Sequence, residues 1–103
     1  MFNFFKTQNS DNFRNKIDFR NYCYNELEKA IKNQYTICLQ KGYTLENNSD
    51  LVAIMLQSEL NQRFEKLKNR IPQICSSNNW VEKEIENEIR IAFRDVYDKY
   101  FKN

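Results

Sequence analysis

The chain has 103 residues and a formal net charge of +2, and it contains no histidine, one glycine and one proline. Histidine is the commonest general base and metal ligand, and glycine-rich loops hold phosphates and dinucleotides, so the composition argues against both kinds of site. Cys23, Cys38 and Cys75 lack the close C-x-x-C spacing of zinc sites. We therefore expect a protein that is not an enzyme and that uses no cofactor or metal.

The scarcity of turn residues predicts one domain made of long helices. The length suits a single domain, and 41% hydrophobic residues suffice for a core. Sheets and hairpins depend on glycine, proline and Asn-Gly turns, which this chain nearly lacks. No apolar run reaches the roughly 18 residues of a membrane span, and residues 1–9, an aromatic leader, lack the features of a signal peptide. The expected class is all-α, and the expected location is the cytoplasm.

The first predicted helix covers residues 11–41. Ser10 or Asp11 offers an N-cap, and Gly42 follows the last turn as a C-terminal glycine. The 3.6-residue period places these residues on one apolar face: Phe13, Ile17, Tyr24, Leu27, Ile31, Tyr35 and Cys38. A helix of this length exceeds the average in globular proteins.

Arg20 lies inside the apolar face of this first helix, between Ile17 and Tyr24. An arginine at such a position extends its guanidinium to solvent, pairs with a carboxylate, or faces a partner. Glu84 and Asp95 of the third predicted helix are candidate carboxylates.

The second predicted helix covers residues 49–71. Its apolar face consists of Val52, Ala53, Leu56, Leu60, Phe64, Leu67 and Ile71. Pro72 should end or kink the helix, because proline removes a backbone donor and clashes with the preceding turn. Ile74 stays in phase with the apolar face if the helix only kinks, and residues 76–79 are expected to form a loop.

The third predicted helix covers residues 79–101. Asn79 is the expected N-cap, and Glu82, three residues later, completes the pattern of a capping box. Its apolar face consists of Val81, Ile85, Ile89, Ala92, Val96 and Tyr100. Three long amphipathic helices with short loops predict an antiparallel three-helix bundle with one long N-terminal helix. The alternative is a dimer-like four-helix arrangement in which the first helix extends past its partners.

Several apolar residues fall outside these faces. The second helix is apolar nearly all round at its start, because Leu51, Ile54 and Met55 point away from its apolar face. Such a helix is covered either by its own protein, here the leader or Tyr43 with Leu45, or by a partner. The other candidates for partner binding are Tyr22, Trp80 and Ile91.

A basic row on the second helix supports an alternative function. Arg63, Lys66 and Arg70 follow an i, i+3, i+7 spacing and could contact phosphates. Glu59 and Glu65 lie beside the row, however, and a pI near 8.4 is below that of typical nucleic-acid-binding domains.

The residues therefore favour a small non-enzymatic helical protein that binds another protein. Inhibitors, immunity proteins, secretion chaperones and adaptors are often of this kind, and an asparagine- and lysine-rich composition typical of AT-rich microbial genes favours an inhibitor or immunity-type protein. A homodimer is compatible with this hypothesis, and a nucleic-acid-binding regulator is the alternative. The three cysteines are expected to be reduced and buried, with pairing left open for Cys75.

Overall fold

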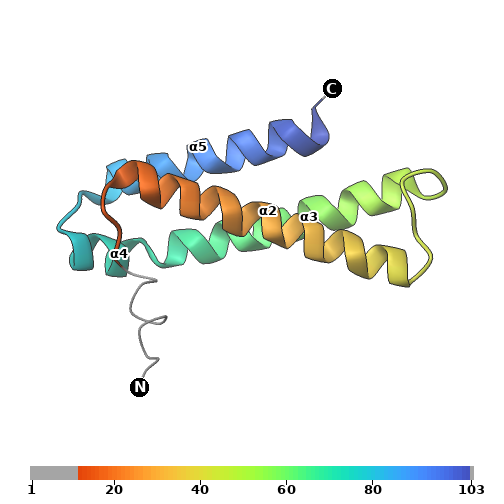
Figure 1. The fold of residues 1–103 in the computed structure, drawn as a ribbon, viewed down its shortest axis with the longest axis horizontal. Coiled ribbons are helices and arrows are strands. Elements are labelled where there is room, and N and C mark those ends of the chain that lie inside the picture. Colours follow the sequence, from red (N-terminus) through yellow and green to blue (C-terminus); the bar gives the residue numbers. More distant parts are fainter. Residues whose placement is uncertain (1–11, 103) are drawn as a thin grey trace, which may run out of the picture.

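The computed structural model describes residues 12–102, which form helices and no strand. In order, the helices are α2 (Lys16–Gln40), α3 (Ser49–Asn69), α4 (Ile71–Asn78) and α5 (Glu82–Phe101). Figure 1 shows three long helices packed together, with the short α4 at one end of the bundle. The prediction of an all-α bundle is confirmed, and the predicted leader at residues 1–9 lies outside the described residues.

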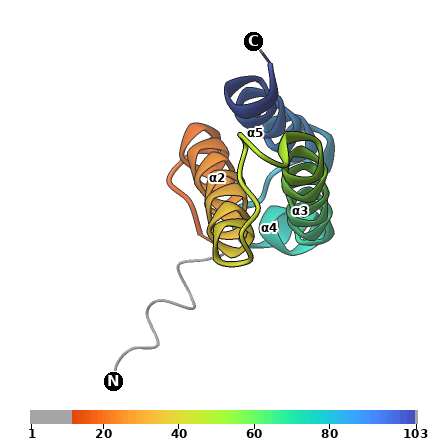
Figure 2. The same ribbon diagram turned by 90° about the vertical axis from the view of Figure 1, so that its right-hand side faces the viewer.

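The long helices alternate in direction. Contacts of Tyr22 with Arg70 and of Cys38 with Met55 show that α3 runs antiparallel to α2. Ion pairs from Lys16 to Glu84 and from Glu28 to Lys99 show that α5 runs parallel to α2. The end-on view in Figure 2 places α2, α3 and α5 around a common core.

Most of the core comes from the apolar faces that the 3.6-residue period predicts. Ile17 and Val81, also predicted on those faces, are exposed, because Ile17 lies in the first turn of α2 and Val81 is the N-cap of α5. Phe19, which the predicted face leaves out, is buried instead. Phe19, Leu27 and Ile31 from α2 meet Val52 and Leu60 from α3, and all of them are buried. These residues complete the core: Cys23, Cys38, Leu56, Leu67, Ile71, Ile74, Cys75, Ile85, Ile89, Ala92 and Val96. Each fully buried aliphatic side chain stabilises the fold by about 1.5–3 kcal/mol.

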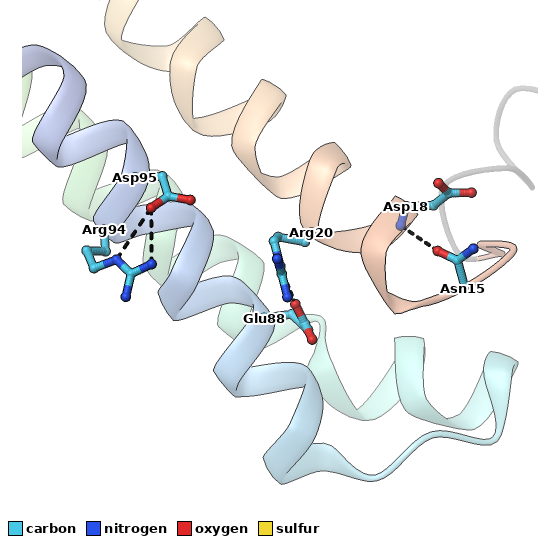
Figure 3. Close-up of polar contacts among 6 residues, drawn as sticks. All are labelled: Asn15, Asp18, Arg20, Glu88, Arg94 and Asp95. Atoms are coloured by element: carbon cyan, nitrogen blue, oxygen red, sulfur yellow. Dashed lines mark hydrogen bonds and ion pairs between the residues drawn. The ribbon is translucent and has the colours of Figure 1, made fainter.

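The first long helix begins later than the sequence predicts. Its N-cap is Asn15, whose side-chain oxygen accepts a hydrogen bond of 2.8 Å from the backbone N–H of Asp18 (Figure 3). Residues 12–14 do not continue the helix; the backbone N–H of Phe13 instead donates to the side chain of Asn78. The predicted start at residue 11 is therefore wrong, whereas Gly42 ends this helix as predicted, with φ of 86°.

Pro72 separates two helices. α3 ends at Asn69, and α4 begins at Ile71. Pro72 lies in the first turn of α4, where a backbone N–H would have no acceptor within the helix, so the missing N–H costs no hydrogen bond. Ile74 stays buried, as expected for a break that keeps the apolar face in phase. The helix α4 reaches Asn78, so the predicted loop at residues 76–79 is mostly helical.

Asn79 has the opposite role to the one predicted. It ends α4 in the left-handed conformation, with φ of 59° and ψ of 47°. The N-cap of α5 is Val81, which makes no side-chain capping bond, so no capping box forms with Glu82. The end at Phe101 agrees with the prediction.

The hairpin of α2 and α3 extends past the C-terminal end of α5 (Figure 1). Tyr100, in the last turn of α5, bonds to Glu28, and α2 continues for about three further turns to Gln40. The far part of the hairpin is therefore a two-helix arm on which apolar side chains have less cover.

Candidate protein-binding surface

The start of α3 carries the most exposed aliphatic residue of the described chain. Ile54 is 65% exposed and Leu51 is 41% exposed, whereas Val52 and Leu56 on the opposite side are in the core. Met55 is partly buried, and its sulfur lies 3.9 Å from the sulfur of Cys38. The bundle thus encloses Met55 but leaves Leu51 and Ile54 open.

The alternative of self-burial is only partly realised at this surface. Tyr43 packs against the core, but Leu45 is 52% exposed. Ile37 and Leu39 near the end of α2 are also exposed, at 40% and 46%. The two-helix arm therefore gathers several exposed aliphatic residues. Sequence periodicity does not reveal the exposure of Ile37, Leu39 and Leu45, because it does not show how far along the hairpin of α2 and α3 the helix α5 reaches.

Tyr22 and Trp80 pack within the bundle. The ring centroids of Tyr22 and Phe13 are 5.3 Å apart, and the hydroxyl of Tyr22 accepts a hydrogen bond of 2.7 Å from Arg70. Trp80 makes an edge contact with Phe19 at a centroid distance of 6.4 Å. Both side chains are partly buried and pack against the core.

Ile91 is partly exposed on α5, away from the buried positions of that helix. It lies on α5, whereas Leu51 and Ile54 lie on α3. The six predicted partner-binding residues therefore do not form one surface; Leu51 and Ile54, with the edge of Met55, form the continuous part.

An aromatic row on α5 was not predicted as a surface feature. Phe93, Tyr97 and Phe101 follow an i, i+4, i+8 spacing, with ring centroids 6.2 Å and 5.1 Å apart. Phe64 of α3 joins the row at 4.5 Å from Phe93, so the rings close the boundary between the two helices. Tyr97 is 38% exposed. The i, i+4, i+8 spacing is visible in the sequence, but the row lies beside the predicted apolar face of this helix and not on it.

The basic row on α3 is largely engaged inside the protein. Arg63 donates to Glu26 of α2 at 3.1 Å, and Arg70 donates to Tyr22 and lies over its ring. Lys66 is exposed. Two of the three cations thus connect α3 to α2, which leaves less positive charge for phosphates than the spacing suggests.

Arg20 connects α2 to α5. Its Nε donates to Glu88 at 2.6 Å, as Figure 3 shows. The candidate carboxylates have other partners, because Glu84 pairs with Lys16 at 2.5 Å and Asp95 with Arg94 at 3.3 Å. The hydrogen bond that Arg20 donates to Glu88 raises the pKa of Arg20 above its ordinary value.

Glu28 forms a second polar link between these helices. Its Oε2 accepts from Lys99 at 2.6 Å and from the hydroxyl of Tyr100 at 2.7 Å. The hydrogen bond from Lys99, with that from Tyr100, lowers the pKa of Glu28. Burial and the adjacent carboxylate raise the pKa of Tyr100 to about 12, so its phenol remains a donor. This link connects the last turn of α5 to the middle of α2.

The thiols are structural groups. Cys23, Cys38 and Cys75 are free and buried. Burial raises the pKa of Cys23 to about 12 and also raises the pKa of Cys75, which disfavours the reactive thiolate. Within residues 12–102, no group of three or more cysteine and acidic side chains is placed to hold a metal ion. No helix in that range is long and apolar enough to cross a membrane.

In comparisons with known proteins, no protein family model, curated protein or solved structure matches this chain.

Proposed function

We propose that the protein has no enzymatic activity and acts by binding another protein through the outer surface of α3. The single observation that carries this proposal is the exposure of Ile54 and Leu51, 65% and 41%, at the start of a helix whose opposite side is already in the core. Contiguous exposed apolar side chains are typical of interaction sites. We favour an inhibitor or immunity-type protein. A secretion chaperone or adaptor is the alternative class, and it would use the same surface.

The test uses the product of the neighbouring gene, because inhibitors and chaperones are commonly encoded beside their targets. The two proteins are co-expressed, and capture on a tag is measured for wild type and for the Leu51→Glu, Ile54→Asp variant. We expect capture by the wild type and its loss in the variant, with an unchanged helical circular dichroism spectrum. Ile17→Asp is the matched control, because Ile17 is 52% exposed on a different helix. Equal capture by all three proteins would contradict the proposed surface.

The nucleic-acid alternative predicts a different response to salt. Binding through phosphates weakens steeply between about 50 and about 200 mM salt, whereas binding through apolar side chains changes little. Tight, salt-sensitive binding of duplex DNA that is abolished by Lys66→Glu would refute the protein-binding proposal. Lys66 is the suitable position, because reversing Arg63 would also break its ion pair with Glu26.

A further inference from the structure

The side of α2 that packs against α5 continues past the end of α5. Tyr100, in the last turn of α5, donates to Glu28 of α2, and α5 ends one residue later at Phe101 (Figure 1). Leu39 lies 11 residues after Glu28, which is three helical turns, so it is on the same side of α2 about 16 Å further along. Leu39 is 46% exposed. Its exposure therefore follows from the shortness of α5.

The helix α3 shows the same geometry. Phe64 packs against Phe93 of α5, with ring centroids 4.5 Å apart. Ala53 lies 11 residues before Phe64 and is therefore on the same side of α3, also three turns away. Ile54, next to Ala53, is at the edge of this side and is 65% exposed.

These positions on α2 and α3 lie at the same height. The sulfur atoms of Cys38 and Met55 are 3.9 Å apart, so their neighbours Leu39 and Ile54 are level with each other on the antiparallel pair. Tyr35 lies one turn before Leu39 on the same side and is partly buried. We call the following residues the open side of the arm: Tyr35, Leu39, Ala53 and Ile54.

The middle of the arm carries no charge. Residues 33–40 of α2 and 51–58 of α3 contain no charged residue, in a chain in which 29% of the residues are charged. Asparagine, glutamine and serine therefore supply the polarity of the arm together with exposed aliphatic side chains. An uncharged surface of this kind suits a partner that packs through apolar side chains.

The end of the open side nearest α5 is basic. Residues 28–32 and 98–102 contain four lysines and two carboxylates, Glu28 and Asp98. Glu28 is bonded by Lys99, and Lys32 lies one turn after Glu28 on α2. Lys102 follows the last residue of α5. Lysines therefore outnumber carboxylates where α5 ends.

The tip of the arm has the opposite sign. Residues 41–50 contain the charged residues Lys41, Glu46 and Asp50, so carboxylates exceed lysines. A helix commonly has acidic side chains in its first turn and basic side chains in its last turn, because these complement its own dipole. Such a helix matches the open side when its first turn lies beside the lysines and its last turn lies beside the tip. Its N-terminal N–H groups then face the last carbonyl groups of α5.

We infer that the partner contributes an amphipathic α-helix that packs against the open side of the arm, end to end with α5 and in the same direction. The inference rests on the proposed function, because it names the element of the partner that contacts Ile54. The helix takes the place that α5 would occupy if α5 were longer, so it packs against the same sides of α2 and α3. It presents apolar side chains to Leu39 and Ile54 and acidic side chains to Lys32 and Lys102.

The first test compares two aliphatic residues of α2. Leu39→Asp should weaken binding of the neighbouring gene product at least about tenfold, measured by isothermal titration calorimetry, because it places a charge in an apolar contact. Ile37→Asp is the matched control. Ile37 is 40% exposed, but it is two residues from Leu39 and therefore on nearly the opposite side of α2. Ile37→Asp should bind within about twofold of wild type, and both variants should keep the helical circular dichroism spectrum.

The second test concerns the direction of the bound helix. Lys32→Glu should weaken binding by about threefold or more at low salt, because it opposes the acidic first turn of the partner helix. Lys66→Glu is the control, because Lys66 is an exposed lysine on the side of α3 away from the open side. Equal effects of Lys32→Glu and Lys66→Glu would overturn the proposed direction.

The outcomes separate this inference from the proposed function. Loss of binding in Leu39→Asp but not in Ile37→Asp supports the helix on the open side. Binding that the Leu51→Glu, Ile54→Asp variant abolishes but Leu39→Asp leaves intact would support the proposed function and overturn the inference. Equal weakening by Leu39→Asp and Ile37→Asp would also overturn it. A wild-type chain that does not bind the neighbouring gene product would refute both.

Discussion

The ion pair between Arg20 and Glu88 should stabilise the fold measurably, whereas its neighbour one turn earlier should not. Both pairs connect α2 to α5 with the same sequence separation, and their distances are 2.6 Å for Arg20–Glu88 and 2.5 Å for Lys16–Glu84. Burial distinguishes them, because Glu88 has a side chain that is 13% exposed, against 55% for Glu84. The two glutamates thus form a matched comparison.

The expected magnitude follows from this difference in burial. A hydrogen bond to a charged group contributes about 1.5–3 kcal/mol, but the Arg20 side chain is 33% exposed, and water compensates part of its loss. Glu88→Gln, which keeps the side-chain volume, should therefore cost about 1–2 kcal/mol of unfolding free energy. Glu84→Gln should cost about 0–0.5 kcal/mol, as for other exposed pairs. In a domain of this size the first variant should melt roughly 5–10 °C below wild type.

Urea unfolding followed by circular dichroism measures both values. Double-mutant cycles with Arg20→Met and Lys16→Met isolate the pair contributions, which should be about 1 kcal/mol and near zero. Indistinguishable unfolding free energies for Glu88→Gln and Glu84→Gln would show that burial does not control the strength of these links, and the reasoning would be wrong.

Two further predictions concern titratable groups. Burial raises the pKa of Cys23 to about 12, and all three cysteines are buried. The thiols of the native protein should therefore resist Ellman's reagent, and all three should react after unfolding. Rapid labelling of Cys23 in the native protein, in preference to Cys75, would contradict the packing. The pKa of Glu28 is lowered in the fold by Lys99 and Tyr100, so its ionised form stabilises the protein above the ordinary value of 4.5, and this contribution is lost as pH falls through the lowered value. The difference in unfolding free energy between wild type and Glu28→Gln should therefore be largest near neutral pH and shrink as the pH falls below the ordinary value of 4.5, and a constant difference would refute the assignment.

The sequence predicts the buried faces of the helices well, because the 3.6-residue period is a property of every residue in a long segment. Leu27, Leu60 and Ile89 are predicted core residues and are fully buried. Pairing between helices is harder to predict. The period determines on which face of its helix a residue lies, but it does not determine the axial register between two neighbouring helices. Arg20 therefore meets Glu88, although Glu84 and Asp95 lie on the same helix.

The candidate site shows the same limitation. The period separates Leu51 and Ile54 from the core, and both are exposed. It also places Tyr22 opposite the apolar face, yet Phe13, from the segment before α2, packs against that ring at 5.3 Å. A non-helical segment such as the one that carries Phe13 has no periodic pattern. The packing of Tyr22 could therefore not be predicted from the pattern of α2 alone.

Substitutions at Asn79 distinguish a left-handed C-cap of α4 from an N-cap of α5. Its φ of 59° is left-handed, where glycine has no steric cost and other L-residues except asparagine and aspartate are disfavoured by about 1–2 kcal/mol. Asn79→Gly should therefore equal or exceed wild type in unfolding free energy, and Asn79→Ser should be about 1 kcal/mol less stable. An N-cap follows the reverse order, because serine caps about as well as asparagine and glycine caps slightly worse. Asn15, whose side chain does cap α2, is the internal control and should show that reverse order. If urea unfolding gives both positions the same ranking, with serine above glycine, then Asn79 acts as an N-cap, and the assignment of Asn79 as the left-handed C-cap of α4 is refuted.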